Sequence, residues 1–326
     1  MKLSLLLRST TVIAITFLSV YLPANAQEFP PKKTITMVVG FAAGGASDNA
    51  ARIIAKKLSE DLGQNVIVDN KPGAGGNIAH AYTATAPTDG SVILLGSIGP
   101  LSIAPHLMKL TYDPQKDLAP LTMGMNFPNV LVVTPELGVK NLKEFVALAK
   151  KKPGQITFAS TGPGSASHLQ GELLNVRANI DTVHVPYKGG SPAMVDLLGG
   201  RVSGYYSTIS TAEPYIKSGQ LIPIASTGLK RSTSLPNVPT IAESGYPGFD
   251  ATNWYAFVAP GKTPELILDK WNKALVAVLT DKATNKLLAE HGLAPTPGSR
   301  EELAKYIASQ SATWAKIISD RKITDE

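Results

Sequence analysis

The sequence of 326 residues contains no cysteine. This absence excludes disulfide bonds, thiolate metal sites, a cysteine nucleophile and a lipid-modified N-terminal cysteine. A chain that folds outside the cytosol without disulfides needs a large hydrophobic core, and a chain of this length suffices for two lobes that each bury one. Charged residues are few as well, at 17% against 44% hydrophobic residues, which excludes an intrinsically disordered chain.

Hydrophobic runs long enough to span a membrane are also missing. The longest apolar stretch, 11–22, follows Lys2 and Arg8 and precedes Ala24-Asn25-Ala26. A basic start, a short apolar middle and a small-residue site form the pattern of a secretory signal peptide. We therefore expect cleavage after Ala26 and a periplasmic mature protein. An uncleaved anchor helix is the alternative interpretation.

The excess of positive charge is small. The whole chain has a net charge of +6, and removal of Lys2 and Arg8 with the signal peptide lowers it further. The basic residues form no block of five or six, so we expect no nucleic-acid partner. A mild positive charge suits weak steering of an anionic ligand.

Short β-branched runs alternate with segments of helical periodicity along most of the chain. A strand, a helix and a second strand at this spacing predict right-handed crossovers and a parallel sheet. We expect strands at 35–39, 65–69, 91–97, 156–160, 182–187, 202–207 and 221–226, with helices between them.

Two amphipathic helices follow in the C-terminal part. Thr263 is the predicted N-cap of the first, and Ser299 with Glu302 forms a predicted capping box for the second. Trp271 and Trp314 lie on the apolar stripes of these helices, so we interpret both as core residues.

Four loops rich in glycine or serine each follow a strand and precede a helix, at 40–48, 70–77, 160–167 and 186–192. In an open sheet such loops gather at the carboxyl ends of the strands, where ligands bind. Their backbone N–H groups and the following helix N-termini favour an anion. One helix end contributes at most about 2 kcal/mol, whereas micromolar binding needs about 8 kcal/mol, so several loops would have to act together. Ordinary turns are the alternative interpretation.

Motifs for catalysis and nucleotide binding are missing. Ala46 stands where a P-loop needs lysine, and Ser167 replaces the third glycine of a dinucleotide motif. The five histidines have no metal-binding spacing, and no nucleophile elbow occurs. A pair of Ser165 with His168 is conceivable, but neighbours at helical spacing more often cap and pack. We therefore expect neither an enzyme nor a cofactor.

Several segments together resemble one known family. The chain resembles the substrate-binding proteins of tripartite tricarboxylate transporters, the Bug or TctC-like family, from about Pro30 to the last helix. The most specific segments are 44–52, 71–79, 112–121, 184–202, 235–249 and 253–264.

The resemblance implies an α/β fold with two lobes, the type II or Venus-flytrap fold of periplasmic binding proteins. The chain would cross twice between the lobes. After a signal peptide at 1–26, lobe one would comprise 27–125 plus 251–326, and lobe two 126–250.

The resemblance also implies that the four loops hold the ligand through backbone amides, small hydroxyl groups and bound waters. Asp48 is a candidate for fixing its loop, and Ser165 is expected to donate to a carboxylate rather than chiefly to cap its helix. Tyr205 and Tyr206 are not among the aromatic residues that we expect to line the site. The candidate ligand-binding residues are Phe41, Gly44, Gly45, Ser47, Asp48, Gly76, Asn77, Ser160, Thr161, Gly164, Ser165, His168, Tyr187, Lys188, Gly189 and Ser207.

Two departures from the family pattern bear on this site. Ala42-Ala43 replaces a proline often found there, which predicts a looser first loop. Ser207 stands where many members have aspartate, which argues against a basic or amino-acid ligand.

The implied function is capture of a small carboxylate, such as a di- or tricarboxylate or an aromatic acid. A monomer would deliver it to the membrane components of a tripartite tricarboxylate transporter. A periplasmic sensor that presents its bound form to a membrane histidine kinase is the alternative, and the sequence does not separate the two.

Overall fold

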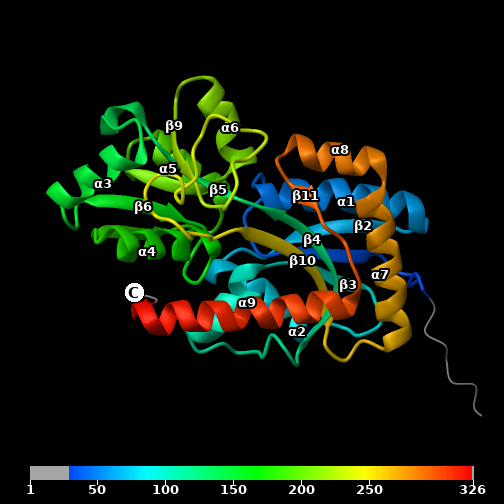
Figure 1. Cartoon of the computed structure of the whole chain (residues 1–326). Coiled ribbons are helices and arrows are strands. Elements are labelled where there is room, and N and C mark those ends of the chain that lie inside the picture. The colour runs from blue at the N-terminus through cyan, green and yellow to red at the C-terminus, as the bar shows by residue number, and fades with distance from the viewer. Residues whose placement is uncertain (1–28, 325–326) are drawn as a thin grey trace, which may run out of the picture.

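The strands form two separate sheets. The computed structural model of the chain describes residues 29–324, and Figure 1 shows the sheets side by side. The first sheet has the strand order β11-β4-β10-β3-β1-β2. Its strands are β1 (Ile35–Val39), β2 (Val66–Asn70), β3 (Val92–Ser97), β4 (Leu118–Phe127), β10 (Asn253–Pro260) and β11 (Ala294–Pro295).

The second sheet has the strand order β7-β6-β8-β5-β9. The chain enters it between β4 and β5 and returns to the first sheet between β9 and β10. Two crossovers therefore join two α/β lobes, as the resemblance predicted. The strands of this second lobe are β5 (Asn129–Val133), β6 (Ile156–Ser160), β7 (Thr182–Pro186), β8 (Gly204–Thr208) and β9 (Ile222–Ser226).

Both sheets are mixed, so the expectation of a parallel sheet is correct only for the strand-helix-strand units. β1 is parallel to β2 and β3, and β6 is parallel to β7 and β8. However, β10 is antiparallel to β3 and β4, and β5 is antiparallel to β8 and β9. β5 and β10 are the strands that follow the two crossovers, so they enter their sheets from the other lobe rather than through a strand-helix-strand unit.

Helices cover both faces of the first sheet, and its central strands are therefore buried on both sides. Ile35, Met37 and Val39 of β1 pack in one cluster with residues of three helices, whereas Val38 faces a second cluster. This alternation follows from the two-residue period of a strand. The first face carries α1 (Ala46–Leu62), α7 (Glu265–Thr280) and α8 (Lys282–Glu290), and the second carries α2 (Asn77–Ala84) and α9 (Arg300–Arg321).

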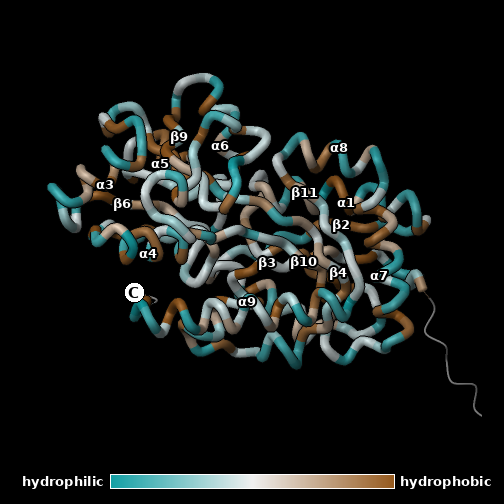
Figure 2. The backbone as a smooth tube through the Cα atoms, in the orientation of Figure 1, coloured by the Kyte–Doolittle hydropathy of each residue, from teal (hydrophilic) through white to brown (hydrophobic). Residues whose placement is uncertain are grey.

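The second sheet is covered in the same way. Val130 and Tyr205 pack on one face, and Leu131 and Tyr206 on the other. Figure 2 shows hydrophobic residues gathered along the sheets and hydrophilic residues on the outer turns of the helices. One face carries α3 (Leu142–Lys151) and α4 (Ala166–Ala178), and the other carries α5 (Gly190–Leu198) and α6 (Ile209–Lys217).

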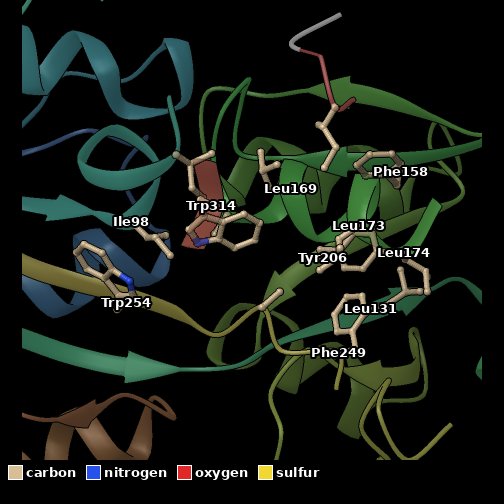
Figure 3. Close-up of a cluster of buried hydrophobic side chains, with 14 of the residues drawn as sticks. Ile98, Leu131, Phe158, Leu169, Leu173, Leu174, Tyr206, Phe249, Trp254 and Trp314 are labelled. Carbon is tan, nitrogen blue, oxygen red and sulfur yellow. The ribbon is translucent and has the colours of Figure 1, made fainter. Parts of the chain in front are cut away.

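One hydrophobic cluster extends through both lobes along α9. Trp314 and Ile318 of α9 belong to the same cluster as Leu169 and Leu173 of α4. Figure 3 shows Trp314 beside Leu169, and in Figure 1 the C-terminal end of α9 lies below α4. This helix therefore connects the lobes in addition to the two crossovers.

The predicted C-terminal helices are present, with one correction at a helix start. Ser299 and Glu302 form the predicted capping box, and Trp271 and Trp314 are buried. Thr263 is not the N-cap of α7, because the helix begins one residue later and Pro264 occupies that position. Among the described residues, the buried Thr263 hydroxyl has no hydrogen-bond partner. Helix α8 was not predicted.

Candidate functional site

A cavity lies where loops of the two lobes face each other. The space not filled by protein atoms there is about 450 Å³, open solvent included. Its lining residues are Phe41, Gly45, Ala46, Ser47, Ser97, Asn253 and Tyr255 of the first lobe and Asn129, Thr161, Ser167, Gly190, Tyr205, Tyr206, Thr208 and Thr211 of the second.

This lining is polar but carries no charged side chain. Burial raises the pKa of both Tyr205 and Tyr255, which keeps their phenols protonated and able to donate hydrogen bonds. Ser97 is 4% exposed, and its hydroxyl has no partner within the described residues. The cavity therefore offers neutral donors rather than a cation.

Four helices begin at the cavity. First-turn residues of α1, α4, α5 and α6 line it, namely Ser47, Ser167, Gly190 and Thr211. The N-cap residues of α1, α5 and α6 make no side-chain capping hydrogen bond. Unpaired N–H groups and the positive ends of helix dipoles favour an anion. Because α1 belongs to the first lobe and the other three to the second, this electrostatic environment is complete only when the lobes meet.

The cavity brings together four of the residues predicted from the sequence, Phe41, Gly45, Ser47 and Thr161. The others do not line the cavity, and their part in ligand binding stays a prediction. They are Gly44, Asp48, Gly76, Asn77, Ser160, Gly164, Ser165, His168, Tyr187, Lys188, Gly189 and Ser207.

Some of these residues lie at the contact between the lobes. The Ala42 N–H donates to the Lys188 carbonyl at 3.0 Å, so the Lys188 carbonyl contacts the backbone of the first lobe. A Cβ on Gly189 would lie 2.8 Å from the Ala42 nitrogen, and a Cβ on Gly44 would lie 3.3 Å from the Ser191 hydroxyl. These glycines allow the two backbones to approach closely.

Asp48 lies beneath the first loop rather than in the cavity. It is 2% exposed and accepts hydrogen bonds from the Gly44 N–H, Arg52 and Asn70, each at 2.9 Å. Burial raises the pKa of the Asp48 carboxyl, but these three hydrogen bonds and the charge of Arg52 outweigh burial and hold it below its ordinary value. Asp48 thus fixes a loop that has no proline at 42–43.

Ser165 occupies the N-cap of α4. Its hydroxyl accepts from the His168 N–H at 3.4 Å and lies 3.2 Å from the Ser167 hydroxyl. Ser167, not Ser165, belongs to the cavity lining. The structure therefore places Ser165 at the helix cap, and its expected donation to a carboxylate stays a prediction.

Two buried histidines, His80 and His168, and the half-buried His184 support the loops. The rings of His168 and His184 stack at 4.0 Å, the Gly164 N–H donates to His168 Nδ1 at 3.2 Å, and His184 Nε2 contacts the Ser160 hydroxyl. Burial lowers the pKa of His184 to about 4, and burial together with the neighbouring His184 lowers that of His168 to about 3.

His80 forms a similar contact in the first lobe. Its Nδ1 lies 2.9 Å from the Gly76 carbonyl, and burial lowers its pKa to about 4 despite that contact. The Asn77 amide donates to the Ala74 carbonyl at 2.7 Å and accepts from the Tyr112 hydroxyl at 2.8 Å. Gly76 and Asn77 therefore fix the conformation of their loop through contacts outside the cavity lining.

Three tyrosines do not lie where the sequence predicted relative to the cavity. Tyr205 and Tyr206 line the cavity, whereas the Tyr187 hydroxyl donates to Asp196 at 2.7 Å outside it. Ser207 lies between Tyr206 and Thr208, but its hydroxyl donates to the Thr208 carbonyl at 2.9 Å.

Sequence reasoning missed the polar residues at strand ends. Ser97 ends β3, Asn129 begins β5 and Asn253 begins β10. A polar residue at the end of a strongly hydrophobic strand is the signal that could have found Ser97. Asn129 and Asn253 follow the crossovers, which the sequence did not locate to the residue. Their amides are linked, since Asn253 Nδ2 lies 3.5 Å from Asn129 Oδ1.

Comparison with protein families gives one match over most of the chain. The model for the tripartite tricarboxylate transporter family receptor (TctC) matches residues 50–323. Among curated proteins, BugT of Bordetella pertussis is 37% identical over 300 residues, which cover 91% of this chain and 92% of BugT.

Solved structures share the fold over nearly the whole chain. Periplasmic binding protein BugD superimposes with a TM-score of 0.86 at 35% identity and covers 90% of this chain and 99% of its own. Rpa4515 of R. palustris with adipate gives 0.87 at 33% identity, covering 91% and 99%. MatC of Rhodopseudomonas palustris with bound malate gives 0.84 at 31% identity, covering 88% and 99%.

The three histidines with lowered pKa values predict a loss of stability in mild acid. The rings of His80, His168 and His184 stay neutral in the fold but take up protons below about pH 6.5 in the unfolded chain. The unfolded state therefore binds more protons between pH 6.5 and 4, and their stabilisation, complete above 6.5, is lost as the pH falls through the folded pKa values. Burial raises the pKa of Glu172, which offsets part of this loss.

Urea unfolding between pH 7.5 and 4.5 measures this effect, and we expect a decrease on the order of 3 kcal/mol or more. His184→Gln should reduce the slope by about one third, because it removes one of three titrating rings. A free energy of unfolding that is constant over this range would contradict the prediction.

Proposed function

The chain belongs to the tripartite tricarboxylate transporter receptor family, and on that premise we propose that it captures a small carboxylate between its lobes and delivers it to the membrane components of such a transporter. The family consists of solute-binding receptors, not enzymes, and its members are periplasmic binding proteins. The carboxylate ligand and the transporter partner of this chain are the parts that we propose.

The neutral, donor-rich cavity between the lobes carries this proposal. A helix N-terminus stabilises an anion by up to about 2 kcal/mol when partly buried. A hydrogen bond to a charged group contributes about 1.5–3 kcal/mol. Four helix N-termini and the hydroxyl groups around them can therefore supply the roughly 8 kcal/mol of micromolar binding without a cation.

The proteins with adipate and malate support a dicarboxylate in particular. Both molecules carry two carboxylates, and helix N-termini face this cavity from both lobes. No carboxylate side chain belongs to the described lining, so an ammonium group would find no counter-charge there. We therefore propose a dicarboxylate without an amino group.

Titration of the purified mature protein tests this choice. We expect adipate or malate to raise the melting temperature and to form no product. At a hundredfold excess over Kd, the bound ligand should stabilise the folded protein by about 2.7 kcal/mol. Aspartate is the matched control, because it replaces the malate hydroxyl with an ammonium group. Aspartate binding more tightly than both dicarboxylates, or turnover of any of them, would contradict the proposal.

Substitutions of two neighbouring serines test ligand binding and helix capping separately. Ser167→Ala should weaken dicarboxylate binding by about 1.5–3 kcal/mol, because Ser167 lines the cavity. Ser165→Ala is the matched control and should instead lower the stability of the ligand-free protein by about 0.5–2 kcal/mol, because Ser165 caps α4. Calorimetric titration and thermal melting measure both. If Ser165→Ala lost affinity while Ser167→Ala did not, the ligand role would belong to Ser165.

We also propose that the protein is exported, matures by cleavage after Ala26 and acts as a monomer. No helix within residues 29–324 is long and apolar enough to cross a membrane. The proposed cleavage site lies outside the described residues. The intact mass of the exported protein should correspond to a chain that begins at Gln27, and a mass that retains residues 1–26 would contradict cleavage.

A further inference from the structure

The loop at 40–48 is held by side-chain hydrogen bonds at two points, and these points flank its contact with the other lobe. On one side, Asn70 Nδ2 donates to the Phe41 carbonyl at 3.0 Å. On the other, the Gly44 N–H donates to Asp48 Oδ2 at 2.9 Å. Between these points lie Ala42 and Ala43, whose own polar backbone groups are directed elsewhere.

Those two alanines form hydrogen bonds across the cleft. The Ala42 N–H donates to the Lys188 carbonyl at 3.0 Å, and the Ser191 hydroxyl donates to the Ala43 carbonyl at 3.1 Å. We call this pair of bonds the clasp. Neither Lys188 nor Ser191 belongs to the cavity lining, so the clasp lies outside it.

The two fastenings belong to a single network. Asn70 Nδ2 also donates to Asp48 Oδ1 at 2.9 Å, Arg52 Nε donates to Asp48 Oδ2 at 2.9 Å, and Arg52 Nη2 donates to Asn70 Oδ1 at 3.2 Å. Every polar atom of the Asp48 and Asn70 side chains therefore has a partner. Hydrogen bonds of charged and buried groups such as these are strong, and they also hold the loop in a defined geometry.

We propose that Asp48 and Asn70 are positioning residues for lobe closure, which hold the loop so that Ala42 and Ala43 meet Lys188 and Ser191. This inference rests on the proposed binding function, because closure would retain the ligand. Neither side chain lines the cavity, so both act through the loop.

The geometry explains why small displacements of the loop matter. Clasp bonds of 3.0 and 3.1 Å lose most of their strength if either backbone moves by about 1 Å. Open and closed forms of such proteins differ by only a few kcal/mol. Loss of one clasp bond should therefore change the closed-state lifetime by about 3- to 10-fold.

The absence of cysteine gives a direct readout of closure. Lys151→Cys on α3 and Lys273→Cys on α7 place one exposed dye on each lobe. Single-molecule energy transfer between the dyes then reports the population and lifetime of the closed form, without ligand and with adipate.

We expect both Asp48→Asn and Asn70→Ala to shorten the closed-state lifetime by about tenfold, because each disturbs both clasp bonds. Asn70→Ala keeps the test valid if Asp48→Asn does not fold. Asp69→Asn is the matched control on the same strand. The Asp69 carboxylate forms an ion pair with the neighbouring Lys71 at 3.0 Å and is not part of the network around Asp48, so the lifetime of this variant should equal that of the parent protein.

A double-mutant cycle separates positioning from general destabilisation. Ser191→Ala removes one clasp bond, so combining it with Asn70→Ala should shorten the lifetime by less than the product of the two single effects. Fully multiplicative effects, or an unchanged lifetime in Asn70→Ala, would overturn the inference. Lack of adipate binding by the parent protein would instead count against the proposed ligand, because the closed lifetime without ligand still tests the clasp.

Discussion

The two lobes meet backbone against backbone, and this close approach depends on glycine. A Cβ on Gly75 would lie 2.1 Å from the Pro163 carbonyl oxygen of the other lobe, and a Cβ on Gly99 would lie 2.7 Å from the Gly164 carbonyl oxygen. Real side chains do not tolerate such distances. Gly75 also has a φ of 63°, a conformation that glycine adopts without strain. Glycine at these positions therefore allows the two lobes to approach closely beside the cavity.

The electrostatic character of the cavity depends on the approach of the two lobes. Helix N-termini and neutral hydroxyl groups are weak anion ligands in water, but their effect grows when water is excluded and several act at once. Ser47 comes from one lobe and Ser167 from the other, so neither lobe alone offers the complete set. Ligand affinity and lobe closure are therefore expected to be coupled.

Carboxylate, guanidinium and imidazole groups lie behind the loops rather than in the cavity. Asp48 with Arg52 supports the first loop, and His168 with His184 supports the loop of the second lobe. In both places a side chain accepts a hydrogen bond from a glycine N–H, at Gly44 in the first and at Gly164 in the second. The loops thus keep their shape while presenting only neutral groups to a ligand.

Local chemistry in the sequence determined the strands near 35–39 and 156–160, the capping box of Ser299 and the loops that approach the cavity, because periodicity and capping depend on neighbours along the chain. Only the tertiary structure decided which residues of those loops face inward. Asn253 reaches the cavity because a crossover returns the chain between the lobes, whereas Tyr187 turns away to Asp196. These choices depend on contacts between residues far apart in sequence, for which one sequence carries no local signal.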